Sequence, residues 1–225
     1  MLTSENTQAN YQGKTTIKEI KEIRKMSKYT GARNKLFRNL GVKDLSNRKL
    51  TSSMRQTASG QHGAVRKKLS EYALHLNEKQ KIRLTYLVSE KQFSRYYNEA
   101  ARRKGVTGTI LLQLLESRLD NVLFRAGFGI TRKQSRQIVN HGHVLVNGKK
   151  VNIPSYLLKA GDVVTIRERS QSFLKSVLEL IDMPCESAWI TKDAGALKIT
   201  FDRVPEREEL DSELKEQLVI EYYSK

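Results

Sequence analysis

The stretch TRKQSRQIVNHGHVLVNGKKVNI, residues 131–153, constrains the fold of this chain more than any other segment. Thr131, followed three residues later by Gln134, is a capping-box pattern, and Gly142 is a typical helix stop, so a short helix is predicted between them. The pair Asn147–Gly148 then predicts a type I′ hairpin turn, because both residues tolerate positive φ. The sequence therefore predicts a helix that leads directly into a hairpin.

The register of the hairpin follows from its turn, with Val146 opposite Lys149 and Val144 opposite Val151. A third strand is expected at 163–167, which would complete a small helix-helix-sheet module over residues 116–168. Side chains alternate between the two faces of a strand, so one face of the hairpin is expected to face the core and the other to face solvent. The predicted core face holds Val144, Val146, Val151 and Ile153, and the predicted wet face holds His143, Leu145, Lys150 and Asn152.

Helices are expected before this module. Asn77 is a candidate cap for EKQKIRLTYLV, and Ser89 with Gln92 forms a capping-box pattern for a helix that ends at Gly105. The last turn of that helix contains Arg102, Arg103 and Lys104, which suit the helix dipole and could equally contact RNA.

One further helix is expected over LLQLLESRLDNVLFRAG, which ends before Gly127. Its apolar residues repeat at helical spacing and are assigned to the core: Leu112, Leu115, Leu119, Val122 and Ala126. The same spacing places Arg118, Asn121 and Arg125 together on another face.

Charge is distributed very unevenly along the 225 residues, which carry a net charge of +17. Residues 1–110 hold 24 Lys and Arg against 8 Asp and Glu, whereas residues 171–225 hold 7 against 12. A basic excess of this size points to a polyanion, and nucleic acid is the leading candidate. The acidic tail suggests a basic protein neighbour, or a segment that only offsets self-repulsion.

The short helix predicted after Thr131 begins with an unusual concentration of positive charge. Arg132, Lys133 and Arg136 lie where the helix dipole prefers an anion, and no Asp or Glu occupies the first turn. Our hypothesis is that an external phosphate binds at this helix start. The alternative is a solvated basic face with no ligand.

Two segments near the N-terminus also carry RNA-binding features. In GQHG, Gly60 and Gly63 would let backbone amides approach a phosphate, with Gln61 and His62 available to sugar or base. An ordinary turn is the rival interpretation. Further upstream, the basic stretch around Arg33, Lys35 and Arg38 includes Tyr29, which could stack on a base.

Several other classes of site are not expected. The single cysteine, Cys185, excludes an internal disulfide and a cysteine-built zinc cluster, and it favours a reducing compartment. His141 and His143 lack a third nearby ligand, so no metal or other cofactor is predicted. No apolar run approaches the roughly 20 residues of a membrane span. Residues 1–27 are polar, lack an apolar signal core and are expected to form a flexible extension.

The segments ESRLDNVLFRAGF and TRKQSRQIVNHGHVLVNGKKVNIPS resemble the small RNA-binding module named after the fourth small-subunit ribosomal protein. Residues 26–41, residues 60–108 and the ending PEREELDSELKEQLVIEYYSK resemble that ribosomal protein family itself, in the same order. The resemblance therefore covers about residues 26–225. Many relatives have a zinc-binding cysteine cluster in the N-terminal stretch, but here no cysteine precedes Cys185.

The resemblance implies an α+β fold, in which a helical domain built from both chain ends carries the inserted RNA-binding module. The implied organisation is an extension at 1–27, a basic helical rRNA-binding domain at 28–115, the module at 116–170, and an acidic segment at 171–225 that packs back on the helical domain.

The resemblance also implies a function without catalysis. Members of this family bind small-subunit rRNA in its 5′ domain, nucleate assembly of the subunit body and influence translational accuracy. Their implied partners are this rRNA, the neighbouring fifth small-subunit ribosomal protein and mRNA near its entrance, where Arg66, Lys67 and Lys68 would match. The protein is expected in a ribosome of a bacterium or plastid, with no membrane partner and not as a homo-oligomer.

The residue types and the resemblance together define a set of candidate RNA-binding residues. They are Tyr29, Arg33, Lys35, Arg38, Arg55, Gln61, His62, Arg66, Lys67, Lys68, Lys79, Lys81, Arg83, Arg102, Arg103, Lys104, Arg118, Asn121, Arg125, Arg132, Lys133, Arg136, His141, His143, Asn147, Lys149 and Lys150.

Two alternatives belong to other classes. Pseudouridine synthases and tyrosyl-tRNA synthetases can carry the same module, but the 110 residues before it show neither a nucleotide loop nor a convincing catalytic set. A helix-turn-helix DNA repressor would place the helix at 132–141 in a major groove. That alternative explains neither the hairpin nor the basic first domain.

Overall fold

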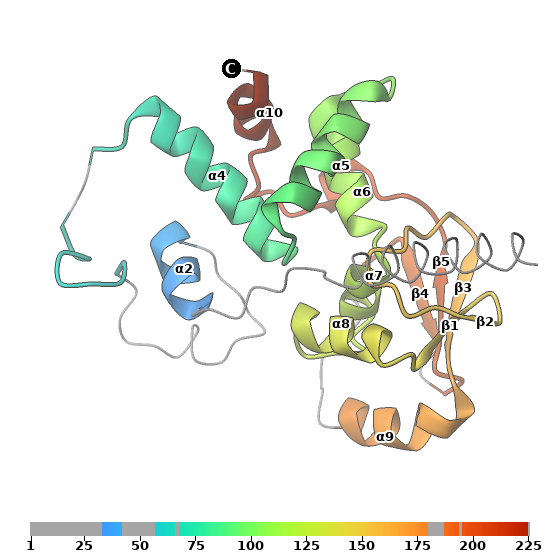
Figure 1. The fold of residues 1–225 in the computed structure, drawn as a ribbon. Coiled ribbons are helices and arrows are strands. Elements are labelled where there is room, and N and C mark those ends of the chain that lie inside the picture. The colour runs from blue at the N-terminus through green and yellow to red at the C-terminus, as the bar shows by residue number, and fades with distance from the viewer. Residues whose placement is uncertain (1–32, 42–56, 66–67, 180–186, 194, 225) are drawn as a thin grey trace, which may run out of the picture. The chain divides into compact units, whose positions relative to one another are not determined.

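The computed structural model describes residues 33–41, 57–65, 68–179, 187–193 and 195–224 (Figure 1). These residues form helices and a small antiparallel sheet, which confirms the predicted α+β class. The helices are α2 (Arg33–Leu40), α4 (Glu71–Thr85), α5 (Glu90–Arg102), α6 (Thr107–Glu116), α7 (Leu119–Arg125), α8 (Arg132–Asn140), α9 (Glu168–Glu179) and α10 (Glu216–Ser224), with a 3-10 turn η1 at Arg207–Glu209. The strands are β1 (Val144–Val146), β2 (Lys149–Lys150), β3 (Asp162–Ile166), β4 (Ile190–Asp193) and β5 (Lys198–Phe201).

The hairpin forms in the predicted register, with Val146 opposite Lys149. Val144 and Val146 are buried, as expected for the core face. The assignment of Ile153 to that face was wrong, because strand β2 ends at Lys150 and Ile153 is 53% exposed. Two positive φ angles at the turn residues, 49° at Asn147 and 76° at Gly148, agree with the predicted turn chemistry.

The sheet extends beyond the segment predicted to contain it. Its strand order is β2-β1-β3-β5-β4, and every neighbouring pair is antiparallel. Strand β3 has two edges, and β1 covers one while β5 covers the other. Strands β4 and β5 therefore complete the sheet of the module, although the predicted module ended at 170. A three-stranded sheet would have left the backbone groups of one β3 edge unpaired.

The last helix, unlike strands β4 and β5, packs on the helical part of the protein. Helix α10 packs against α4 and α6, so the segment after residue 170 contributes to both parts of the fold. Phenol rings contribute to this packing: Tyr223 of α10 stacks on Tyr97 of α5 with ring centroids 4.4 Å apart.

Two predicted helix starts had different outcomes. Helix α4 begins six residues before the predicted cap, at Glu71, where the Ser70 hydroxyl accepts a hydrogen bond from the Ala73 amide at 3.3 Å. Asn77 therefore lies inside α4, and its assignment as a cap was wrong. Helix α5 does begin after Ser89, but the Ser89 side chain makes no capping hydrogen bond. A buried face is sufficient to hold that helix, because tertiary packing outweighs a single cap.

The single helix predicted across residues 112–126 is broken at Ser117–Arg118, between α6 and α7. Arg118 has an extended backbone, with φ −71° and ψ 137°. The chain after the hairpin pairs with the backbone at this break: the Leu119 amide donates to the Tyr156 carbonyl at 2.9 Å, and the Leu158 amide donates to the Ser117 carbonyl at 2.8 Å. These hydrogen bonds replace those that a continuous helix would have made.

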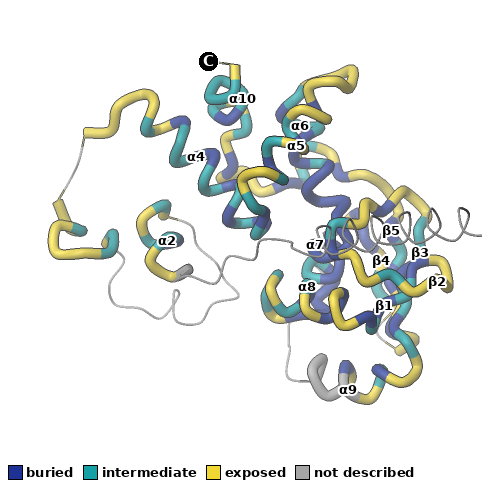
Figure 2. The backbone as a smooth tube through the Cα atoms, viewed as in Figure 1, coloured by how far each residue is buried: buried dark blue, intermediate teal, exposed yellow. Residues whose placement is uncertain are grey.

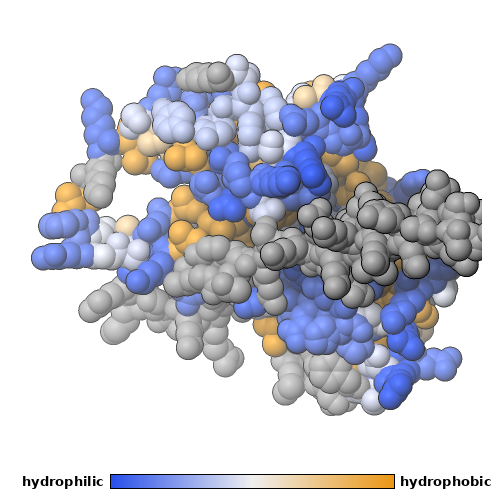
Figure 3. All heavy atoms as spheres, viewed as in Figure 1, coloured by the Kyte–Doolittle hydropathy of each residue, from blue (hydrophilic) through white to orange (hydrophobic). Residues whose placement is uncertain are grey.

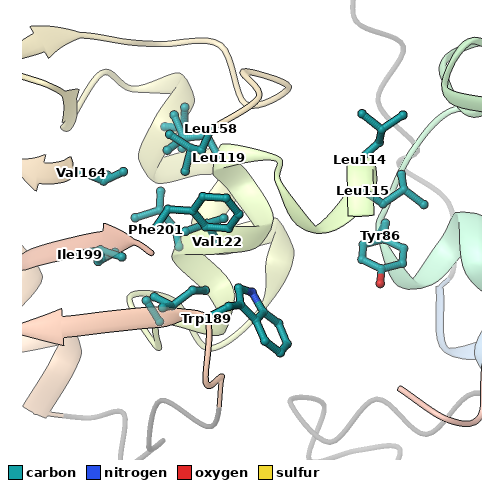
Figure 4. Packing of buried hydrophobic residues seen from close by; sticks show 14 of the residues in the cluster. Tyr86, Leu114, Leu115, Leu119, Val122, Leu158, Val164, Trp189, Ile199 and Phe201 are labelled. Carbon is teal, nitrogen blue, oxygen red and sulfur yellow. The ribbon is translucent and has the colours of Figure 1, made fainter. Parts of the chain in front are cut away.

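A continuous hydrophobic cluster joins the sheet to the helices. Figure 4 shows Val122 of α7 beside Phe201 of β5, with Leu119 and Leu158 near them. In Figure 2 the backbone of α7 is buried, whereas β2 and the far end of α5 are exposed. All five apolar residues assigned to this core are fully buried: Leu112, Leu115, Leu119, Val122 and Ala126.

A glycine permits the close approach of α6 and α10. A Cβ atom added at Gly108 would lie 2.5 Å from Glu216 Cγ and 3.2 Å from Ile220 Cδ1. Glu216 cannot move away freely, because its carboxylate accepts hydrogen bonds from Arg207 at 2.6 and 2.9 Å. Close packing of these two helices therefore depends on the missing side chain.

We expect Gly108→Ala to lower the free energy of unfolding by about 1–2 kcal/mol through overpacking. Alanine favours a helix more than glycine does, so a loss would report the contact between helices and not helix propensity. Thermal unfolding of the variant and the wild-type protein measures this change in stability. Gly195→Ala is the matched control, because its added Cβ would approach only Asp193 Oδ1, at 3.5 Å. Equal stability of the two variants would contradict the proposed close approach.

Candidate nucleic-acid interface

The three cations at the start of α8 do not share one environment. The Thr131 hydroxyl accepts a hydrogen bond from the Gln134 amide at 3.2 Å, so the predicted helix start is confirmed. Arg132 Nε donates to Asn121 Oδ1 at 2.8 Å, and its guanidinium carbon lies 4.3 Å from the ring centroid of Phe124. Arg136 Nη1 donates to the Leu87 carbonyl at 2.8 Å.

Only Lys133 of these three cations is exposed. Arg132 and Arg136 are partly exposed and each makes a contact inside the protein, so phosphate binding by all three cations stays a prediction. Arg136 holds the carbonyl of Leu87, a residue with φ of 51° just after α4. Arg132 and Arg136 therefore join α8 to its neighbours, and Lys133 is the most accessible phosphate candidate on this helix.

We expect Arg136→Ala to lower the free energy of unfolding by about 1.5–3 kcal/mol, the range for a hydrogen bond to a charged group. Lys133→Ala, on the same helix, should change it by no more than about 0.5 kcal/mol, because Lys133 is exposed and makes no recorded ion pair among the described residues. Urea unfolding of both variants measures the difference. A larger loss in the Lys133 variant would refute this division of roles.

A buried carboxylate, Glu116 at the end of α6, collects several groups that were expected to face RNA. It accepts hydrogen bonds from Tyr86 Oη at 2.7 Å, from Arg125 Nη2 at 2.7 Å and from Asn121 Nδ2. Arg125 also contacts Asp211 Oδ2 at 3.3 Å. Asn121 and Arg125 are therefore committed to this network, which we call the Glu116 network.

The protonation states in the Glu116 network follow from its charges. Burial by itself would raise the pKa of Glu116, but the adjacent Arg125 guanidinium and the hydrogen bonds lower it below its ordinary value. Burial, with the Glu116 charge, raises the pKa of the Tyr86 hydroxyl well above its ordinary value. An ionised Glu116 thus accepts a hydrogen bond from a neutral Tyr86 near neutral pH.

Arg118 is one of the buried candidates, because its side chain is only 1% exposed. It lies at the break between α6 and α7, where its guanidinium donates to Asp120 at 3.1 and 2.7 Å and to Tyr96 Oη at 2.7 Å. All of these partners are protein groups, so Arg118 is not available to RNA in this structure. The helical spacing that predicted an exposed face did not account for the break.

The basic residues of α4 are also used within the protein. Lys79 is 4% exposed, forms an ion pair with Glu90 at 2.8 Å and lies 4.3 Å from the ring centroid of Tyr222. Lys81 Nζ donates to the Glu213 carbonyl at 2.7 Å. Arg83 donates to Gln80 Oε1 at 2.6 and 2.9 Å, and Glu90 lies 3.4 Å away. Burial of Lys79 argues against an RNA contact, whereas the assignment of the partly exposed Lys81 and Arg83 to RNA stays a prediction.

The loop containing GQHG is tied to the end of α2. Arg38 donates two hydrogen bonds to the Thr57 carbonyl, at 3.0 and 2.8 Å, and Asn39 Oδ1 accepts from the Ser59 amide at 2.8 Å. A Cβ added at Gly63 would collide with the Ala58 carbonyl oxygen, so the turn itself requires this glycine. The exposed candidates of this region are Lys35, Gln61, His62 and Lys68.

Some candidates lie outside the described residues: Tyr29, Arg55, Arg66 and Lys67, and the side chain of Arg33. Their assignment to RNA stays a prediction.

The hairpin and the end of α5 supply most of the exposed cations among the candidates. Lys149 and Lys150 of β2 are exposed, as is His141, and His143 is partly exposed. Asn147 has a structural use, since Nδ2 donates to Asp162 Oδ1 at 2.8 Å and Oδ1 accepts from the Val163 amide at 2.9 Å. At the end of α5 the exposed cations are Arg102, Arg103 and Lys104, of which Arg103 pairs with Glu99 at 3.1 Å.

Sequence reasoning missed two exposed cations on α5, Lys91 and Arg95. Their i, i+4 spacing, continued by Arg102, would have placed all three on one face of the helix. In Figure 3 hydrophilic residues cover most of the described surface seen from this side, and apolar surface shows between α2 and α4. The candidate interface is therefore a dispersed basic surface and not a pocket.

Other classes of site find no support in the described part of the chain. Its residues include no group of three His, Cys, Asp or Glu placed to hold a metal ion. None of its helices has the length and apolar character needed to cross a membrane.

Comparison with known proteins agrees with this geometry. Residues 28–116 match the family model of the ribosomal protein S4/S9 N-terminal domain, and residues 117–164 match that of the S4 domain.

Curated relatives match over most of the chain. The small ribosomal subunit protein uS4 of Mycoplasmopsis synoviae is 50% identical over 202 residues, which cover 89% of this chain and 100% of the relative. Its counterparts in Nitrosococcus oceani and Hahella chejuensis are each 52% identical, over 212 and 207 residues, with the same coverage. The resemblance predicted from the sequence motifs is confirmed, and the chain belongs to the uS4 family of small ribosomal subunit proteins.

Proposed function

We propose that this protein is a structural constituent of the small ribosomal subunit and binds small-subunit rRNA directly. The observation that carries the proposal is the division between two kinds of cation. Arg118, Arg125 and Lys79 are paired with carboxylates inside the protein. Lys133, Lys149 and Lys150 are exposed, and no ion pair of theirs with a carboxylate is recorded among the described residues.

Unpaired surface cations are suited to phosphate, because neutralising phosphates releases condensed counterions. Most of the exposed cationic candidates lie on or next to α5, α8 and the hairpin β1–β2, which pack on the common core. Recognition would then depend mainly on the shape and backbone of folded RNA and less on base edges. Family membership supports this role over that of an RNA-modifying enzyme.

The finer roles extend the same proposal. The protein would bind the 5′ domain of the rRNA, nucleate assembly of the subunit body and influence translational accuracy in a bacterial or plastid ribosome. Arg66, Lys67 and Lys68 would contact mRNA near its entrance. The fifth small-subunit protein would contact the acidic segment after residue 170, in which Glu206, Glu208 and Glu213 are exposed. The charge asymmetry of the chain supports this last contact.

Binding across a salt series tests the proposal. The full chain is titrated with the 5′-domain fragment of small-subunit rRNA and, separately, with duplex DNA of equal length. We expect the logarithm of the RNA association constant to fall linearly with the logarithm of salt concentration, with RNA preferred at physiological salt. Equal affinity for both nucleic acids at every salt concentration would contradict a specific rRNA role.

A further inference from the structure

Four cationic or titratable side chains gather where α8, the hairpin and α9 approach one another. The rings of His141 and His143 have centroids 5.9 Å apart. The His143 backbone carbonyl accepts a hydrogen bond from the Arg167 amide at 2.9 Å, which places the end of β3 beside it. These contacts join residues that are far apart in the chain.

Lys150 enters the same cluster from strand β2. A Cβ added at Gly142 would lie 2.6 Å from Lys150 Cε and 3.3 Å from Lys150 Nζ, so the lysine side chain lies against the glycine between the two histidines. Gly142 also has φ of +71°, which suits its place after α8. The Lys150 ammonium group therefore lies beside Gly142, the residue between the two histidines.

The orientation of His143 is set by the protein. Its Nδ1 lies 2.8 Å from Ser170 Oγ in the first turn of α9. Burial, His141 and Arg167 all lower the pKa of His143 below its ordinary value. Glu168 and Arg169 are the other charged residues of that first turn, and both are exposed. A neutral imidazole is thus held among positive charges at neutral pH.

We propose that His141, His143, Lys150 and Arg167 form a site for one RNA phosphate, and that phosphate binding is coupled to uptake of one proton by His143. The inference rests on the proposed function and deepens it, since it assigns a proton-linked contact to one part of the interface. Arg167 joins the interface through this cluster; its sequence position after β3 had not suggested such a role.

The physical reason is reciprocal electrostatics. A phosphate anion beside the ring favours the imidazolium, which the surrounding cations disfavour in the free protein. The pKa of His143 therefore rises on binding. Affinity should increase as the pH falls through the pKa of the bound state, and the increase should stop below the pKa of the free state. One coupled proton changes affinity by at most about tenfold per pH unit.

The experiment measures binding of the full chain to the 5′-domain rRNA fragment between pH 5.5 and 8 at constant ionic strength. Calorimetry at pH 6.5 in two buffers of different ionisation enthalpy counts the protons taken up. We expect tighter binding at the lower pH values and a proton uptake between zero and one. His143→Gln keeps a side chain that can bond Ser170 and should lose most of the pH dependence and the uptake.

His75→Gln is the matched control, because His75 lies on α4, is only 4% exposed and is paired with Glu221 instead of facing the candidate interface. It should keep the proton uptake of the wild-type protein. Tight RNA binding without proton uptake, or equal uptake in the wild-type and His143→Gln proteins, would overturn the inference and leave the proposed function intact. Failure to bind the RNA at any pH would instead contradict the proposed function.

Discussion

Replacing Glu116 with Leu is expected to lower the free energy of unfolding by about 3–5 kcal/mol, the cost of removing one partner from a buried ion pair. Glu116 is fully buried and accepts hydrogen bonds from Tyr86, Asn121 and Arg125. Leucine can accept none of them, so a guanidinium, an amide and a phenol would lose a partner together. Urea unfolding followed by circular dichroism measures the loss.

Glu116→Gln provides the milder test if the leucine variant does not fold. It keeps the shape and one acceptor but removes the charge beside Arg125, so its stability should lie between those of Glu116→Leu and the wild-type protein. Glu208→Gln is the control, since Glu208 is exposed. A loss below about 0.5 kcal/mol in Glu116→Leu, the usual range of a surface substitution, would show that the Glu116 network does not stabilise the fold.

The same residue should make stability depend on pH. The pKa of Glu116 is lowered in the folded protein, so the stability it contributes is present above its unfolded pKa of about 4.3 and is lost as the pH falls through the lower folded pKa. The wild-type protein should therefore lose stability on acidification more steeply than Glu116→Leu does. Parallel stability curves below pH 5 would contradict the lowered pKa.

Replacing Lys133, Lys149 and Lys150 together with Ala is expected to weaken binding to the 5′-domain rRNA by roughly 10- to 100-fold near physiological salt. Each lost phosphate contact should also reduce the slope of log K against log salt by roughly 0.7 to 0.9. These lysines are exposed, so the fold should be unchanged. Filter binding across a salt series gives both quantities, and circular dichroism checks the fold.

The control variant also removes three lysine charges, but from positions outside the proposed interface. Lys175, Lys198 and Lys215 are exposed lysines on α9, on β5 and just before α10, outside the proposed interface. Replacing these three with Ala should change the slope of log K against log salt by less than the roughly 0.7 to 0.9 expected for one phosphate contact. If the two triple variants lost affinity equally, binding would depend on net charge alone and not on the helix α8 and hairpin surface.

Local chemistry accounts for the parts of the fold that sequence reasoning predicted. The Asn147–Gly148 turn determines the register of the hairpin, because a positive φ at both positions selects one turn type. Thr131 begins α8 because its hydroxyl satisfies the Gln134 amide. The leucines of 112–126 are buried as predicted, because their spacing survives the helix break. Each of these features depends on residues close together in the chain.

The candidate site was predicted less well, since a cation has the same sequence signature whether it binds a carboxylate or a phosphate. Lys133 and Arg136 lie on the same short helix, yet Lys133 is exposed and Arg136 holds the carbonyl of Leu87. The partner of Arg136 lies 49 residues away in the chain. No local pattern specifies such a contact.

The α+β class, the hairpin, the core leucines and the family could be predicted from the sequence, because they depend on turn chemistry, hydrophobic spacing and long motifs. The folded structure was needed to show that strands β4 and β5 complete the sheet and that Arg118, Arg125 and Lys79 are paired inside the protein. The physical reason is that strand edges and buried charges are satisfied by distant groups, which come together only when the chain is folded.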